Sequence, residues 1–387
     1  MKIGFISTHT NATPPLGYGG EVFYANLVKG LAEKGHEVHL FATGGSDIPK
    51  GGKLHLIPSA PEGQIQKWIE DWLVNKYASI LMDMDIVHDC SLDHVPAEKL
   101  RYLYGKKEII NTINGTTYYM PRPPFNVVTG SRFWQNDALS VGLPTEMVYW
   151  GVDTEFYTPQ IKHNADSDVN MLLPENWEFL YNKEDYLLWI ARFHPSKGLE
   201  IALELAEVLG FKLKVAGSMQ FKDHRFYGEK YLEIIEKLPN VEYVELPQDH
   251  RHHEAKRELM QKAMAFLYPV NYKECFGMVV AEAMACGTPV IATPNGAMPE
   301  LIDDNTNGFI CKTKREFSQA ITKQLPYYWE NRKHHEGFDL WKNARKKAEQ
   351  FDVSKSVDAY EKLYEKVIGG YSWGPSGIPV MSSEQST

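Results

Sequence analysis

The stretch that decides the fold reads KECFGMVVAEAMACGTPVIATPNGAMPELI and spans residues 273–302. Residues 278–286 form an apolar run typical of a buried helix, and residues 289–293 form a short apolar strand. Two carboxylates interrupt this apolar sequence, because Glu274 precedes the predicted helix and Glu282 lies at its centre. A buried carboxylate destabilises a fold unless a partner satisfies it. We therefore expect Glu282 to contact either a ligand or a basic residue of the protein.

Short strands alternate with helices on both sides of this stretch. The first strand is predicted at residues 2–7, a loop rich in Pro and Gly follows at 14–20, and a helical pattern leads to a second strand at 36–43. This order is a βαβ unit, which places the two strands in parallel. Further strands are predicted at residues 85–90, 108–114, 125–130, 146–151, 186–193, 211–217, 241–246 and 265–270, and further helices at 198–209, 253–264 and 354–368. The sequence thus predicts two α/β domains, each a Rossmann-like doubly wound sheet, which face each other across an interdomain cleft.

A polar stretch without clear periodicity, residues 158–183, separates the two series of strands. We predict an N-terminal domain of residues 1–155 and a C-terminal domain of residues 156–352, followed by a separate helix at 353–368. Residues 369–387 are predicted to form a loose tail. Ligands of doubly wound sheets bind in the crevice at the carboxyl ends of the strands, so we expect the functional residues on the loops that face the cleft.

The overall composition is that of a globular protein with an acidic balance. The chain has 387 residues, with 41 Lys and Arg against 50 Asp and Glu and a formal net charge of −9. No basic stretch could follow a nucleic-acid backbone, and no apolar run approaches the ~18–20 residues that span a bilayer. The four cysteines show no C-x-x-C spacing, which indicates reduced thiols. We therefore expect a cytoplasmic protein without a transmembrane segment and without a nucleic-acid partner.

Two groups of residues suit a ligand that carries phosphates. Gly19 and Gly20 lie between the first strand and the first helix, where glycines let backbone amides approach a phosphate closely. Arg192 ends a strand and Lys197 lies at the start of the next helix, so two cations stand at the mouth of the cleft. A plain tight turn and a pair of solvated surface cations are the simpler interpretations of these signals.

The quoted stretch adds hydrogen-bonding groups to this set. Glu274 is expected on a loop that faces the cleft, and Glu282 could accept hydrogen bonds from the vicinal hydroxyls of a ribose. The amides of Phe276 and Gly277, with Met278 at the N-terminus of the predicted helix, would face a diphosphate.

Other signals in the sequence are weaker. No G-x-G-x-x-G follows the first strand, which argues against a dehydrogenase. The run DHRHHEAKRE at residues 249–258 contains histidines that could bind a metal, but its spacing is loose. A solvated loop that caps a helix explains this run better, so we expect no metal site there.

These motifs together resemble those of the family 4 glycosyltransferases, which are retaining enzymes of the GT-B fold that use sugar nucleotides. The pair Glu274 and Glu282 matches the E-x(7)-E motif of the family. Further segments that resemble the family, in the same order along the chain, are PPLGYGGEVFYANLVKGLAEKGHEVHLFATGGS (14–46), YWGVDTEFYTP (149–159), ARFHPSKG (191–198) and NGAMPELI (295–302). The resemblance covers nearly the whole chain, and its most specific part is residues 274–302.

The resemblance implies a role for each matching residue. It places Gly19, Gly20, Phe276, Gly277, Met278 and Glu282 in the donor site, and it gives catalytic roles to Arg192, Lys197 and Glu274. Glu282 would hold the nucleotide ribose, and Glu274 would contact the hydroxyls of the donor sugar. Arg192 and Lys197 would stabilise the diphosphate as it leaves, so no metal or other cofactor is expected. The C-terminal domain would bind the nucleotide sugar, the N-terminal domain would lie on the acceptor side, and the helix at 353–368 would cross back to the N-terminal domain.

The chain departs from the family pattern at one position near the donor sugar. Many members have a histidine where this chain has Asn114, and an amide cannot act as an acid or base at neutral pH. His88 could contact the acceptor or the sugar instead, although a buried structural histidine is an equally good interpretation.

The implied function is transfer of a hexose from a nucleoside diphosphate sugar to an acceptor hydroxyl with retention of the anomeric configuration. UDP-glucose is favoured as donor because it is common in the family, whereas the sequence determines neither the acceptor nor the oligomeric state. Two alternatives stay open, a sugar-nucleotide epimerase of the same fold and a non-catalytic nucleotide-sugar-binding protein. The substitution at Asn114 favours the binding protein, and the intact set of cations and carboxylates argues against it.

Overall fold

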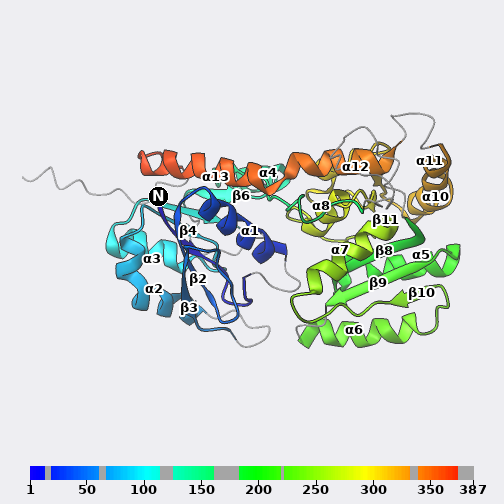
Figure 1. Ribbon diagram of the computed structural model, residues 1–387, viewed down its shortest axis with the longest axis horizontal. Helices are drawn as coiled ribbons and strands as arrows, with labels where there is room; N and C mark the ends of the chain where they lie inside the picture. The colour runs from blue at the N-terminus through cyan, green and yellow to red at the C-terminus, as the bar shows by residue number, and fades with distance from the viewer. Residues whose placement is uncertain are drawn as a thin grey trace, which may run out of the picture.

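The computed structural model describes residues 1–13, 19–60, 67–113, 125–160, 183–218, 222–331 and 339–373. These residues form two lobes, each built on a parallel β-sheet flanked by helices. Figure 1 shows the lobes side by side, with a long helical segment that runs along both of them. The prediction of two Rossmann-like doubly wound domains is confirmed.

The first sheet contains seven parallel strands in the order β3-β2-β1-β4-β5-β6-β7. Its strands are β1 (Lys2–Ile6), β2 (Glu37–Thr43), β3 (Lys53–Ile57), β4 (Ile86–Asp89), β5 (Ile109–Thr112), β6 (Val127–Thr129) and β7 (Thr145–Met147). The helices of this lobe are α1 (Gly19–Glu33), α2 (Lys67–Met82), α3 (Val95–Tyr104) and α4 (Arg132–Ser140). Central strands such as β4 are buried along their whole length, because helices cover both faces of the sheet.

The second sheet contains six parallel strands in the order β10-β9-β8-β11-β12-β13. Its strands are β8 (Glu184–Arg192), β9 (Leu213–Ser218), β10 (Val241–Tyr243), β11 (Ala263–Tyr268), β12 (Val290–Ala292) and β13 (Gly308–Ile310). The helices that follow are α5 (Leu199–Leu209), α6 (Lys222–Ile235), α7 (His252–Lys262), α8 (Met278–Ala285), α9 (Met298–Leu301), α10 (Lys314–Gln319), α11 (Leu325–Asn331), α12 (Leu340–Ala348) and α13 (Val353–Ile368). The apolar helix expected within the stretch that decides the fold is α8.

Each sheet has one point at which the order of its strands reverses. Neighbouring strands that are not consecutive in the chain meet at β1–β4 in the first sheet and at β8–β11 in the second. A crevice opens outside the carboxyl ends of the strands at such a switch point, and doubly wound folds bind their ligands there. The loops after these four strands are therefore the positions from which functional side chains can reach a ligand.

The two lobes share a continuous apolar core. In the first lobe, Leu27 of α1 and Tyr360 of α13 pack on one face of the sheet, and Leu73 of α2 and Leu100 of α3 pack on the other. The cluster on the α1 side extends into the second lobe, where it includes Val280 of α8. Packing between the lobes therefore holds their facing edges close together.

The chain passes between the lobes in both directions. Residues 148–160 lead from the first lobe to the second, and α12 and α13 lead back along one side, where α13 contacts α1, β4 and β5 (Figure 1). Arg345 of α12 fixes this crossing, because its Nη1 donates to the carbonyl oxygens of Thr154, Tyr157 and Ala285 at 2.9, 2.8 and 2.9 Å.

The structure differs from the sequence prediction in a few elements. Strand β3 was not predicted, because it is an edge strand whose partly exposed residues lack a clear apolar pattern. The helix predicted at 253–264 ends at Lys262, where β11 begins. Most of the stretch 158–183 lies outside the described residues, and the domain boundaries stay a prediction. Among the residues that the structure describes, no helix combines the length and apolar character that a membrane span requires.

Candidate active site

The crevice of the second lobe lies at the β8–β11 switch point, and the loops after these strands carry predicted site residues. Arg192 is the last residue of β8, and a 3-10 turn, Pro195–Lys197, follows it before α5 begins. After β11 the chain runs through residues 269–277 to α8, and Glu274 lies on this loop. The fold therefore brings Arg192, Lys197 and Glu274 to one edge of one sheet.

Lys197 and Glu274 form a buried ion pair. Nζ of Lys197 lies 3.0 Å from Oε2 of Glu274, and the two side chains are only 9% and 11% exposed. The ammonium also donates to the hydroxyls of Tyr268 and Tyr272 at 3.1 and 2.6 Å. These hydroxyls donate in turn to the two oxygens of Glu274, at 2.7 and 2.5 Å. We call these four side chains the Lys197–Glu274 cluster.

Burial and neighbouring charges set the protonation of the Lys197–Glu274 cluster. Burial lowers the pKa of Lys197, and the positive charge of Arg192 lowers this pKa further. The carboxylate of Glu274 acts in the opposite direction but does not outweigh burial. Burial alone would raise the pKa of Glu274, but the charge of Lys197 and the hydrogen bonds from the two tyrosines outweigh this effect and lower it. The site therefore holds an ionised carboxylate close to two basic side chains.

The N-terminus of α8 meets the start of α1 in the first lobe. Gly277 precedes α8 with a φ of +95°, a left-handed conformation that favours glycine, and a Cβ there would lie 2.4 Å from Cε of Met298. At Gly19, which begins α1 and is followed by Gly20, an added Cβ would lie 2.9 Å from Cβ of Met278. The starts of α1 and α8 thus lie against each other at the boundary of the lobes. Free amides and positive dipole ends at these helix starts suit an anionic group such as a diphosphate.

Glu282 has a basic partner within the protein in this structure. It lies inside α8 with 1% of its surface exposed. Nζ of Lys256 on α7 lies 2.8 Å from its Oε2, which is an ion-pair distance, although the angle is not that of a hydrogen bond. The pKa of the adjacent Tyr157 is raised well above its ordinary value, mainly by burial and in addition by the charge of Glu282. Of the two partners expected for Glu282, the structure contains the basic residue, and the contact to a ribose stays a prediction.

Helix α4 of the first lobe docks on the loop that carries Glu274. The hydroxyl of Ser131 donates to the carbonyl oxygen of Cys275 at 2.7 Å, and Nε1 of Trp134 donates to the carbonyl oxygen of Glu274 at 3.3 Å. These contacts join the backbone of the loop that carries Glu274 to the opposite lobe.

Gly296, on the loop after β12, and Glu300 of α9 also lie at this boundary. A Cβ at Gly296 would lie 2.2 Å from the carbonyl oxygen of Glu274, and its φ is +65°, so no other residue fits there without displacing the loop. The carboxylate of Glu300 accepts hydrogen bonds from the amides of Arg132 and Phe133, the first residues of α4, at 2.9 and 2.8 Å. Glu300 therefore caps a helix of the other lobe.

The residues considered for acceptor or sugar contacts have different outcomes. His88 is fully buried in β4, and its Nδ1 and Nε2 each lie 2.7 Å from a hydroxyl, those of Tyr364 and Thr112 respectively. Because Tyr364 belongs to α13, His88 joins the C-terminal helix to the first sheet, which agrees with the interpretation as a structural histidine. Asn114 lies outside the described residues.

The histidine-rich run at residues 249–258 forms the start of α7. Nδ1 of His252 donates to the carbonyl oxygen of Pro247 at 3.0 Å, which is a local contact that holds the turn before the helix. Within the described ranges, no group of three His, Cys, Asp or Glu side chains is arranged to hold a metal ion.

Three residues that touch the predicted carboxylates were not found from the sequence. Tyr272 precedes Glu274 by two residues, and alternate residues of an extended segment point to the same side, so this signal was available. Tyr268, the last residue of β11, carried a weaker signal of the same kind. Lys256 gave none, because it reaches Glu282 only through the packing of α7 against α8.

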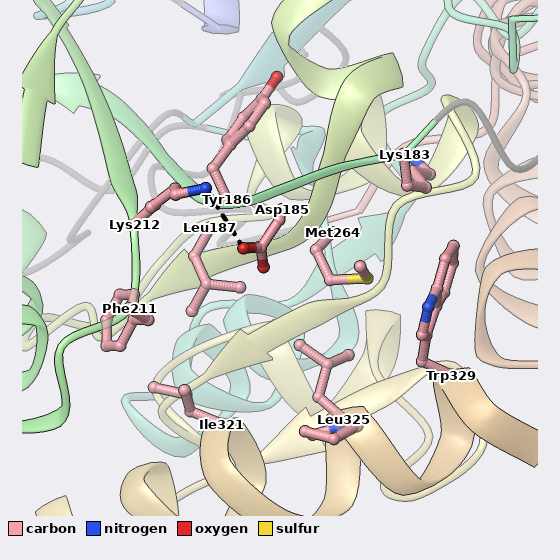
Figure 2. Close-up of a pocket in the computed structure, with 11 residues that line it drawn as sticks. Lys183, Asp185, Tyr186, Leu187, Phe211, Lys212, Met264, Ile321, Leu325 and Trp329 are labelled. Carbon is pink, nitrogen blue, oxygen red and sulfur yellow. Dashed lines mark hydrogen bonds and ion pairs between the residues drawn. The ribbon is translucent and has the colours of Figure 1, made fainter. Parts of the chain in front are cut away.

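A separate cavity of about 450 Å³ opens in the second lobe at the amino ends of the strands, opposite to the Lys197–Glu274 cluster. Figure 2 shows part of its lining, with Leu187 and Met264 from the sheet and Leu325 and Trp329 from the side of α11. Burial lowers the pKa of Lys183, which also lines it, to about 7. None of the predicted site residues contributes to this cavity.

Comparison with known proteins matches part of the chain to a family model. Residues 176–347 match the family model described as Glycosyl transferases group 1. This range contains Arg192, Lys197, Glu274 and Glu282, so the residues at the crevice of the second lobe belong to the matched part of the chain.

Curated relatives carry glycosyltransferase or related synthase names. An uncharacterized glycosyltransferase of Methanocaldococcus jannaschii is 30% identical over 200 residues, which are 50% of this chain and 52% of that protein. The N-acetyl-α-D-glucosaminyl L-malate synthase of Bacillus anthracis is 23% identical over 391 residues, 95% of this chain and 97% of that protein. The D-inositol 3-phosphate glycosyltransferase of Mycobacterium marinum is 26% identical over 233 residues, 59% of this chain and 46% of that protein. The chain thus spans about half the length of two of these relatives and nearly all of the third.

Solved structures share the fold over nearly the whole chain. AviGT4, a glycosyltransferase involved in avilamycin A biosynthesis, superposes with a TM-score of 0.67 at 23% identity and covers 96% of this chain and 99% of its own. The Anabaena protein HepE in complex with UDP-glucose superposes with a TM-score of 0.68 at 18% identity, covering 95% and 100%. The chain therefore contains a glycosyl transferases group 1 domain within a GT-B fold, which confirms the resemblance to the family 4 glycosyltransferases.

Proposed function

We propose that this protein is a retaining glycosyltransferase that moves a hexose from a nucleoside diphosphate sugar, of the UDP-glucose type, to an acceptor hydroxyl. The observation that carries the proposal is the Lys197–Glu274 cluster beside Arg192, at the switch point of the second sheet. A buried carboxylate with two basic neighbours can contact the hydroxyls of a sugar and the oxygens of a diphosphate at the same time. The UDP-glucose complex of the structural neighbour HepE supports this donor.

The chemistry follows from these charges. Lys197 and Arg192 would bind the diphosphate, with one of the hydrogen bonds from Lys197 to a tyrosine exchanged for a phosphate oxygen. Glu274 would accept hydrogen bonds from the sugar and hold its anomeric carbon between the two lobes. The bond from the anomeric carbon to the diphosphate breaks, a bond to the acceptor oxygen forms, and the acceptor proton passes to the departing diphosphate. The cations stabilise the charge that develops on that leaving group.

The proposal includes independence from metal ions. In many sugar-nucleotide enzymes a divalent cation neutralises the diphosphate, and here Arg192 and Lys197 supply two positive charges at the corresponding place. Turnover is therefore expected to persist in excess EDTA, and a loss of activity restored by Mg²⁺ or Mn²⁺ would contradict this part of the proposal.

The test is release of nucleoside diphosphate from UDP-, GDP- and ADP-sugars, with and without simple hydroxyl acceptors and without added metal. We expect one donor to be turned over, if only by slow hydrolysis, and NMR of the product to show the anomeric configuration of the donor. Inversion of the configuration would overturn the retaining mechanism.

The same assay separates the two alternatives. A sugar-nucleotide epimerase would convert the donor into another sugar nucleotide and release no diphosphate in proportion to product. A nucleotide-sugar-binding protein would show a rise in melting temperature with UDP or a UDP-sugar but no product. Either result would overturn the proposed transfer, and the intact Lys197–Glu274 cluster argues against both.

A further inference from the structure

The first lobe has a crevice of its own, at the switch point between β1 and β4. The loop after β1 carries Asn11, and the loop after β4 carries Ser91 and His94. The two strands pair side by side up to their ends, where Ile6 is opposite Asp89. Since Gly19 at the start of α1 touches Met278 of the second lobe, the carboxyl end of this sheet also lies at the boundary of the lobes.

Two buried carboxylates hold the loop after β4 in place. Glu70 of α2 accepts hydrogen bonds from the amides of Leu92, Asp93 and Val95, each at 3.0 Å. Asp89 accepts hydrogen bonds from two further amides of this segment, those of Ser91 and Ala97, both at 2.9 Å. The backbone of the loop is thus fixed from within, which leaves its side chains available for another partner.

Asn11, Ser91 and His94 each have one polar side-chain atom without a hydrogen-bond partner among the described residues. These atoms are Oδ1 of Asn11, Oγ of Ser91 and Nδ1 of His94, on residues that are 5%, 2% and 5% exposed. Buried polar atoms in native proteins are nearly always satisfied, and an exception indicates a missing partner such as a ligand or an ordered water. His94 also has a φ of 53°, an unusual conformation for a residue other than glycine. Three such atoms at one switch point indicate a site for a ligand that offers several hydrogen bonds.

The charges around this crevice are mainly negative. Of the carboxylates there, Glu70 lies 3.6 Å from His9, Asp89 lies 3.9 Å from His94, and Asp93 lies 4.0 Å from Lys67, which is 59% exposed. Burial, with the nearby Asp89, raises the pKa of Glu70 to about 7, and burial lowers the pKa values of both histidines. The sequence segment 14–18, which continues the loop after β1 along the chain, contains no basic residue. An anionic ligand would therefore meet carboxylates here without a buried lysine or arginine among the described residues to balance it.

We propose that Asn11, Ser91 and His94 form the acceptor subsite and that it takes an uncharged polyhydroxylated molecule, such as a sugar or cyclitol without a phosphate or carboxylate. This inference rests on the proposed function and adds the class of acceptor to it. Hydroxyl groups can donate to Oδ1 of Asn11 and exchange hydrogen bonds with Oγ of Ser91 and Nδ1 of His94. Two relatives are named for anionic compounds, L-malate and D-inositol 3-phosphate. The crevice of this chain is built for a different acceptor.

The test compares acceptors that differ only in an anionic group. With the donor that the wild-type protein hydrolyses, transfer is measured to D-glucose against D-glucose 6-phosphate, to myo-inositol against inositol 3-phosphate, and to glycerol against D-glycerate. We expect the uncharged member to have a kcat/KM at least about tenfold higher, because a desolvated anion beside carboxylates is strongly disfavoured. A preference for the anionic members, with donor hydrolysis intact, would overturn the subsite and leave the proposed function standing.

Variants test the residues directly. Ser91→Ala and Asn11→Ala should each raise the KM for the uncharged acceptor by about 3- to 10-fold with little change in kcat, since each removes one hydrogen bond. Ser140→Ala, at an exposed position of α4, is the matched control and should leave this KM unchanged. Equal KM values for Ser91→Ala and Ser140→Ala would show that water, and not the acceptor, satisfies Oγ of Ser91. If the wild-type protein releases no nucleoside diphosphate from any donor, the proposed function fails and the acceptor subsite fails with it.

Discussion

At the scale of single residues, the Lys197–Glu274 cluster is the feature that most requires a functional explanation. Both carboxylate oxygens and the ammonium already have hydrogen-bond partners, and the ion pair is buried. The attraction within a buried ion pair is largely offset by the cost of desolvating both charges, so net stability is a weak reason for such a pair. Its position at a switch point, beside the further cation Arg192, is what the proposed donor site requires.

The first prediction concerns the coupling within this pair. Lys197→Met leaves Glu274 buried without its cation and should reduce the free energy of unfolding by about 3–5 kcal/mol. Glu274→Gln should also destabilise the fold, but the double variant should lose less than the sum, with a coupling of roughly 0.5–3 kcal/mol in urea denaturation. The exposed pair Lys314–Glu204 is the control, and its coupling should stay below about 1 kcal/mol. Additive losses in the buried pair would contradict the geometry described for it.

The second prediction tests whether Glu282 binds the ribose of the nucleotide or only pairs with Lys256. Glu282→Gln should weaken UDP binding about tenfold in calorimetry, because a charged acceptor for the ribose hydroxyls is lost. Lys256→Met removes the ion pair but leaves the carboxylate, so it should lower the melting temperature while UDP affinity changes by less than about threefold. If both variants reduce UDP affinity equally, or neither does, Glu282 has a purely structural role.

At the scale of elements, the sequence predicts what is encoded locally. The alternation of strands and helices, the α8 helix and the loops that carry Arg192, Lys197 and Glu274 could be read from short windows of apolar periodicity and from motif spacing. Lys256 could not, because its partner depends on how the buried face of α7 packs on α8. The same holds for the contacts of Ser131 and Trp134 across the lobes, since no local pattern marks a side chain that bonds to the backbone of another domain.

The third prediction concerns α4 and the closure of the lobes. Glu300→Ala removes the acceptor for the first two amides of α4, so this helix loses a cap worth about 0.5–2 kcal/mol that only the closed arrangement supplies. Small-angle X-ray scattering should show a larger radius of gyration, and kcat should fall more than the affinity for UDP. Glu316→Ala, which removes a contact at the start of α10 within one lobe, is the control and should leave the radius unchanged. A radius that does not respond to Glu300→Ala would show that apolar packing alone holds the lobes together.

At the scale of the whole molecule, α13 ties the end of the second lobe to the sheet of the first. His88 lies at the centre of this contact, between Tyr364 of α13 and Thr112 of β5, with its ring against Tyr360 at 4.9 Å between centroids. Burial lowers the pKa of His88 to about 3. The contact therefore depends on a neutral imidazole, and the connection between the lobes inherits this dependence on pH.

The last prediction follows from this shift in pKa. The unfolded chain has an ordinary histidine pKa of about 6.5, so between pH 6.5 and 3 it binds a proton that the folded protein does not. The stability that depends on neutral His88 is thus fully present above about pH 6.5 and decreases as the pH falls towards 3, by roughly 2 kcal/mol between pH 7.5 and 5. His88→Gln should have a lower free energy of unfolding than the wild type at pH 7.5. In urea denaturation at pH 5, the difference between the two proteins should be smaller by this amount. His250→Gln, at an exposed position, controls for the loss of an imidazole. If this difference in the free energy of unfolding does not change with pH, α13 withdraws from the sheet and lets water reach His88 before the protein unfolds.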